Sequence, residues 1–238
     1  MAAQIDAWHQ ADDRRVIFLT CYWMTTRNVL HTIHEGGFID GPWVERLLTR
    51  FAAYYWDALD AREAGLQAPR VWNLAHDVAE DPAGIAVESL LLGVNAHINH
   101  DLVLAVADLL RPEWDTLDAV RKGHRHSDFD TINTVIADTI ATVEATVIAE
   151  YAHLARWFTQ WAAPAEHTVM LHLIHSWRDD VWQRATETFV PMTEGDEALR
   201  HSLDADAVAR MHGLLATTTF AEHRFLRAFT WAHRHHVL

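Results

Sequence analysis

Residues 85–110 read IAVESLLLGVNAHINHDLVLAVADLL, and this stretch decides the fold class. Apolar runs stand on both sides of a polar block, whose members are Asn95, His97, Asn99, His100 and Asp101. A segment with such flanks is typical of a helix in a protein interior. Its polar block is then buried too, and each polar group without a hydrogen-bond partner would cost about 1–3 kcal/mol. The sequence therefore predicts a polar site within a core helix.

The remainder of the chain also has the pattern of helices. Half of its 238 residues are apolar, and only 9 glycines and 6 prolines interrupt them, which argues against disorder and against a turn-rich β fold. Long runs without strand-like alternation lie between the breaks. The predicted helices cover residues 10–34, 42–64, 69–79, 82–110, 113–121, 128–162, 165–189 and 204–235. We expect one all-α domain over residues 1–238, a bundle of about eight helices.

Charge and cysteine content narrow the classes of function. The net charge of −14 opposes binding to nucleic acids or anionic membranes, because both attract basic surfaces. The single cysteine, Cys21, allows no intramolecular disulfide and no thiolate-based metal site. The N-terminal residues lack the basic start and apolar stretch of a secretory signal. We expect a cytoplasmic protein that acts on a small molecule, and a face-to-face homodimer stays open.

Histidine is abundant and regularly spaced. The chain has 18 histidines, and the HxxH pairs are His31/His34, His97/His100, His172/His175 and His233/His236. Random placement would give roughly one such pair. The first three pairs fall in predicted core helices with a carboxylate nearby. Residues spaced by three or four share a helix face, and facing helices in a bundle can build a metal site from them.

The leading prediction is therefore a metal-dependent, hydrolase-like enzyme. The expected metal ligands are His97 and Asp101, with His31, His34, His172, His175 and Asp179 as further candidates. Histidine and carboxylate ligands without thiolate suit Zn, Fe or Mn. Such an ion would lower the pKa of a bound water for attack on an ester, amide or phosphoester, with His100 or Asp128 transferring the proton.

Other functions remain open. The same histidine and aspartate could act as acid and base in a metal-free cyclase or isomerase, and an iron-dependent oxygenase is a variant of the metal hypothesis. Eleven tryptophans could provide an apolar pocket for an aromatic or otherwise natural-product-like substrate. Arg178 is a candidate to hold an anionic substrate group or to form an ion pair. In a non-catalytic binding domain, the buried histidines would only specify packing.

Residues 91–102, LLGVNAHINHDL, resemble an uncharacterised bacterial and fungal domain family of unknown function centred on an NAHIN-x-DL motif. Further residues that look like its landmarks are Met24, Thr25, Phe38, Asp40, Trp43, Phe51, Tyr54, Tyr55, Trp72, Arg125, Asp128, Phe129, Ile132, Asn133, Arg178 and Trp182. The resemblance implies an all-helical single domain and draws attention to His97, Asp101, Asp128 and Asn133. It implies no established reaction or cofactor. His100 stands where an aromatic residue is expected in that family.

Overall fold

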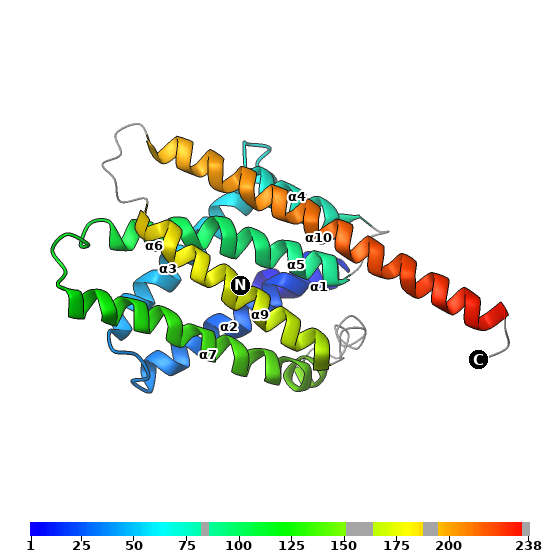
Figure 1. The fold of residues 1–238 in the computed structure, drawn as a ribbon, viewed down its shortest axis with the longest axis horizontal. Helices are drawn as coiled ribbons and strands as arrows, with labels where there is room; N and C mark the ends of the chain where they lie inside the picture. The colour runs from blue at the N-terminus through cyan, green and yellow to red at the C-terminus, as the bar shows by residue number, and fades with distance from the viewer. Residues whose placement is uncertain (82–85, 151–163, 188–194, 235–238) are drawn as a thin grey trace.

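The segment with the polar block forms one helical rod through the middle of the bundle (Figure 1). The rod consists of α5 (Ala86–Ala96), a π-helical turn (His97–Leu102) and α6 (Val103–Leu110). All six residues of the π-helical turn are buried. Turns of this kind inside α-helices are frequent at functional sites. The span Glu88–Leu110 is long and apolar enough to cross a membrane, but nearly all of it is buried in the protein, as in a core helix.

The computed structural model describes residues 1–81, 86–150, 164–187 and 195–234. With the rod counted once, these residues form eight helices and no strand. The other helices are α1 (Ala2–Gln10), α2 (Arg15–His34), α3 (Gly41–Glu63), α4 (Arg70–Glu80), α7 (Ala119–Glu150), α9 (Pro164–Glu187) and α10 (Gly195–Arg234). The predicted all-α bundle is thus confirmed.

Several predicted helix boundaries were wrong. The helix expected over residues 10–34 begins only at Arg15 as α2, a separate helix that was not predicted, α1, precedes it, and Asp12 between them has a positive φ of 54°. No helix covers 113–121. Instead, α7 begins at Ala119, where the Asp118 carboxylate accepts a hydrogen bond from the backbone N–H of Arg121. An aspartate at such a cap starts a helix, and an isolated glycine such as Gly123 does not end one. The expected end at residue 162 lies outside the described residues.

The rod packs against five other helices. α4 and α10 contact α5, α3 and α9 contact α6, and α2 contacts α5 while also packing on α7. Buried apolar side chains form two clusters, one centred on α1, α2, α4 and α5 and the other on α3, α6, α7 and α9. The π-helical turn contacts α3, α9 and α10, so its polar block lies where several helices meet.

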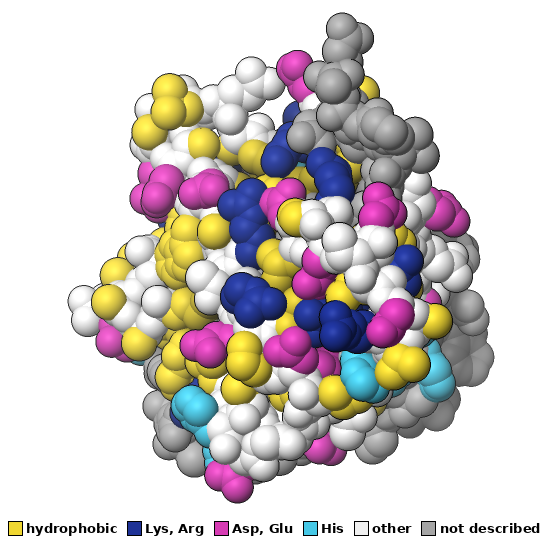
Figure 2. Space-filling view, turned by 90° about the vertical axis from the view of Figure 1, so that its left-hand side faces the viewer, with side chains coloured by type: hydrophobic (Ala, Val, Ile, Leu, Met, Phe, Trp, Pro, Cys, Tyr) yellow, Lys and Arg dark blue, Asp and Glu magenta, His cyan; other side chains and the backbone are white. Residues whose placement is uncertain are grey.

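The surface carries charges of both signs. Figure 2 shows a face on which Lys and Arg side chains lie among Asp and Glu side chains. Ion pairs of the described residues join Arg50 to Asp108, at 2.6 Å, and Arg125 to both Asp40 and Glu113, at 2.6 and 2.8 Å. Partly exposed pairs of this kind each contribute little, so burial around the rod is the main source of stability.

Gly93 allows α2 to pack closely on the rod. A Cβ atom at residue 93 would lie only 2.6 Å from the ring of Phe18. We expect Gly93→Ala to lower the free energy of unfolding by about 1–3 kcal/mol, because the aromatic ring must move within a packed core. Gly123→Ala is the matched control, since a Cβ atom added there would meet nothing within 4 Å beyond its chain neighbours and its own helix backbone. In urea denaturation, Gly123→Ala should raise the free energy of unfolding by up to about 1 kcal/mol. Equal effects of the two substitutions would contradict this packing.

Candidate active site

Asp101 is the centre of a buried hydrogen-bond network. Its side chain is 1% exposed. One oxygen, Oδ2, accepts from His97 Nδ1 at 3.1 Å, and Oδ1 accepts from His100 Nδ1 at 2.8 Å. The indole N–H of Trp72, on α4, lies 3.1 and 3.0 Å from the two oxygens. Burial alone would raise the pKa of Asp101, but the hydrogen bonds from His100 and His97 outweigh it and hold this pKa below its usual value. Asp101 is therefore an ionised carboxylate with three donors.

His97 is held as a neutral base by this network. A carboxylate can only accept, so Nδ1 carries the ring proton and the lone pair lies on Nε2. The ring stacks on Phe51, with centroids 3.6 Å apart, and meets the edge of Tyr22 at 4.2 Å. Burial lowers the pKa of His97 more than Asp101 raises it. Nε2 is buried and has no hydrogen-bond partner among the described residues.

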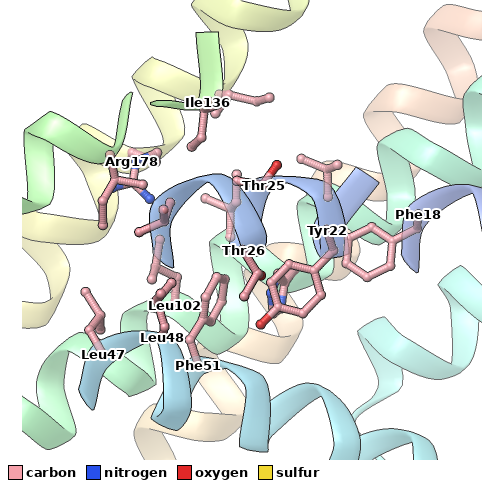
Figure 3. Close-up of a pocket in the computed structure, with 16 residues that line it drawn as sticks. Phe18, Tyr22, Thr25, Thr26, Leu47, Leu48, Phe51, Leu102, Ile136 and Arg178 are labelled. Atoms are coloured by element: carbon pink, nitrogen blue, oxygen red, sulfur yellow. The ribbon is translucent and has the colours of Figure 1, made fainter. Parts of the chain in front are cut away.

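His97 borders a partly open cavity of about 110 Å³ (Figure 3). The cavity lies among α2, α3, the rod, α7 and α9, and its walls are mainly Phe, Leu, Ile and Val side chains. The polar lining residues are Tyr22, Thr25, Thr26, His97 and Arg178. Because Nδ1 of His97 is bound to Asp101, Nε2 is the ring nitrogen left without a partner among the described residues, and its own exposed surface is below 1 Å².

Two residues of α2 that carry hydroxyl groups line the same cavity as His97. Tyr22 and Thr26 are one helical turn apart, and both line the cavity. Both hydroxyls are buried, and apart from the contact between Tyr22 and Thr26 themselves, neither has a hydrogen-bond partner among the described residues. Burial raises the pKa of Tyr22, so its phenol stays protonated at neutral pH. The site therefore combines a neutral base with two hydroxyls that can donate to a substrate oxygen.

The two asparagines of the polar block fix the rod to α10. Asn99 Nδ2 donates to Asn95 Oδ1 at 3.0 Å, and Asn95 Nδ2 donates to the carbonyl of Ala207 at 2.9 Å. Both side chains are buried. These bonds satisfy polar groups between packed helices, which identifies Asn95 and Asn99 as structural members of the block.

The structure does not bring the other expected metal ligands to His97 and Asp101. His31, His34, His172 and Asp179 are exposed, and His175 is half-buried. Within residues 1–81, 86–150, 164–187 and 195–234, no three His, Cys, Asp or Glu side chains form a group suited to a metal ion. The spacing of an HxxH pair places both histidines on one helix face, but packing decides whether that face turns inward.

The two residues expected to transfer protons also lie elsewhere. His100 is bound to Asp101 and does not line the cavity. Asp128 is buried, and its oxygens accept from the backbone N–H groups of Ile39 and Asp40 at 2.7 and 2.8 Å. Asp128 thus fastens the turn before α3 to α7. The hydroxyls of Tyr22 and Thr26 were missed, although the spacing of Phe18, Tyr22 and Thr26 already places them on one face of an apolar helix.

The fold and the site define an all-α bundle in which a buried His–Asp pair borders an apolar cavity. The chain belongs to a family of unknown function, DUF5995, whose model matches residues 1–217. The resemblance to an uncharacterised family is thereby confirmed. The matched range contains the Asp101 network and every residue that lines the cavity. Neither a curated protein nor a solved structure matches the chain.

Proposed function

We propose that the protein is an acid–base enzyme of the isomerase or cyclase type, acting on a small, largely apolar molecule. The observation that carries this proposal is Nε2 of His97, a buried basic nitrogen beside a cavity and without a partner in the described part of the chain. An unpaired buried nitrogen costs about 1–3 kcal/mol, a penalty that a bound substrate would remove. Pairing with Asp101 fixes the tautomer and stabilises the imidazolium formed when Nε2 takes a proton.

The arrangement suits proton transfer at a carbon next to a carbonyl group. Nε2 of His97 would take the proton, the C–H electron pair would form a carbon–carbon double bond, and the carbonyl oxygen would become an enolate. The hydroxyl of Tyr22 or Thr26 would donate a hydrogen bond to that oxygen. In a β,γ-unsaturated substrate this enolate is a dienolate, and return of the proton from Nε2 to its γ carbon gives the conjugated isomer and restores the neutral base. The apolar walls strengthen these interactions by excluding water.

Deuterium exchange tests this function without knowledge of the product. The purified protein would be incubated in D₂O with short ketones and keto acids, and deuterium at carbon would be measured by mass spectrometry. We expect at least one compound to exchange faster than in buffer, both before and after dialysis against EDTA. No exchange with any compound, in protein shown to be folded, would contradict the proposal. Exchange lost with EDTA and restored by Zn, Fe or Mn would instead support the metal-dependent enzyme that the sequence suggested.

A further inference from the structure

Arg178 is a buried cation at the wall of the cavity. It lies on α9 and is 3% exposed. Its Nε donates to Asn133 Oδ1, its Nη2 donates to the carbonyl of Phe129 at 2.7 Å, and its guanidinium lies over the Phe129 ring at 4.1 Å. All of these partners are neutral. They fix the guanidinium plane but do not compensate its charge.

No described carboxylate forms an ion pair with Arg178. Its sequence neighbour Asp179 is exposed, and Asp130 lies near His126, at 3.6 Å. Burial lowers the pKa of Arg178 to about 10, although the nearby charges of Asp130 and Asp179 raise it in part, so the side chain remains charged at neutral pH. Nη1 makes no hydrogen bond within the described part of the chain. A buried arginine in this state is a strong site for an anion, since guanidinium binds carboxylates through parallel N–H donors.

The cavity has a cationic end and a basic end. Figure 3 shows Arg178 on one side and Tyr22 with Phe18 on the other. The ring of His97 lies 4.2 Å from that of Tyr22, so the base belongs to the second end. Along α2, the lining extends from Tyr22 to Val29, a rise of about 10 Å at about 1.5 Å per residue. A single molecule could therefore place an anionic head and a reacting carbon at different ends.

We propose that the cavity binds a small carboxylic acid, with its carboxylate on Arg178 and its apolar body directed toward His97. As an assignment of substrate class, this rests on the proposed function, although carboxylate binding can be tested separately. A monoanion matches Arg178, the one cation among the described residues that line the cavity, whereas a phosphate dianion would leave charge unpaired among apolar walls. At about 110 Å³ the cavity is smaller than the cavity of about 150 Å³ that holds benzene, so its volume favours a short chain over a ring as the apolar body.

The test compares hexanoate with hexanamide, its neutral counterpart of similar shape, by titration calorimetry at pH 7. We expect hexanoate to bind the wild-type protein at least about tenfold more tightly than hexanamide. Arg178→Met should abolish this preference. Arg184→Met should retain it, because Arg184 lies on α9 like Arg178 but is partly exposed and pairs with Asp206 of α10. Equal binding of the two compounds to the wild type would overturn the proposal, as would an undiminished preference in Arg178→Met.

A second readout covers failure of Arg178→Met to fold. In the wild type, hexanoate should shift the Arg178 Nε–H resonance in nitrogen-15 NMR, while hexanamide and inorganic phosphate should not. A shift with phosphate alone, or no shift with hexanoate, would contradict carboxylate recognition. The two proposals fail separately. Arg178-dependent hexanoate binding without any deuterium exchange would contradict only the proposed acid–base activity. Exchange that Arg178→Met leaves unchanged would contradict only the proposed carboxylic acid substrate.

Discussion

Replacement of His97 by glutamine is expected to slow deuterium exchange into a substrate by about 10²- to 10⁴-fold, the usual contribution of a positioned general base. Glutamine retains a polar group of similar length but has no basic nitrogen. The cavity walls and the hydroxyls of Tyr22 and Thr26 would remain, so weak substrate binding should persist. The measurement is the initial rate of exchange for wild type and variant at the same pH.

The control for this experiment is His31→Gln, which changes an exposed histidine outside the cavity. Its exchange rate should equal that of the wild type. The pH profile adds a second check. Because burial lowers the pKa of His97, the wild-type rate should remain high below pH 6.5, the ordinary histidine pKa, and decline only in more acidic solution. An exchange rate in His97→Gln equal to that of the control would show that another group removes the proton.

Replacement of Asp101 by alanine should lower the free energy of unfolding by about 3–5 kcal/mol, as expected when one partner of a buried charged network is removed. The substitution leaves the N–H donors of His97, His100 and Trp72 without their acceptor. Asp204→Ala is the matched control, since Asp204 is 7% exposed and accepts one backbone N–H, from Val71 at 2.8 Å. Its expected cost is about 1–3 kcal/mol.

The Asp101 effect should also depend on pH. A carboxylate with a lowered pKa in the folded state stabilises the protein above its unfolded-state pKa, about 3.9, and this contribution is lost as the pH falls through the folded-state value. The difference between wild type and Asp101→Ala in chemical denaturation should therefore be constant from pH 5 to 7 and narrow below about pH 4. Equal costs for Asp101→Ala and Asp204→Ala would show that the network around Asp101 contributes no more than a single hydrogen bond.

The fold could be predicted because its signals are local. Apolar runs on either side of Asn95 to Asp101 require a core helix, and the i,i+4 spacing of His97 and Asp101 places them together whatever the surroundings. Helix boundaries were less predictable. Capping by Asp118 depends on a single side chain, and the π-helical turn lies within an apolar pattern that also fits an uninterrupted α-helix.

The cavity could not be predicted because it is made by tertiary packing. Phe51 comes from α3, Thr26 from α2 and Arg178 from α9, and no spacing within one helix brings them together. The expected metal cluster illustrates the same limit. His31 and His34 share a face of α2, as their spacing requires, but the apolar side chains of α2 pack inward and leave that face exposed. Sequence spacing reports neighbours on one helix, and burial of apolar surface decides which face meets the core.

The most direct test of the account is the protonation state of His97, observed by nitrogen-15 NMR of the histidine side chains. Its resonances would be identified by their loss in His97→Gln. We predict a neutral ring at pH 7, with the proton on Nδ1 and a bare Nε2, that remains neutral as the pH falls below the ordinary histidine pKa of about 6.5. A ring protonated on Nε2 at pH 7, whether as the other tautomer or as the imidazolium, would contradict the proposal that His97 is the base of this site.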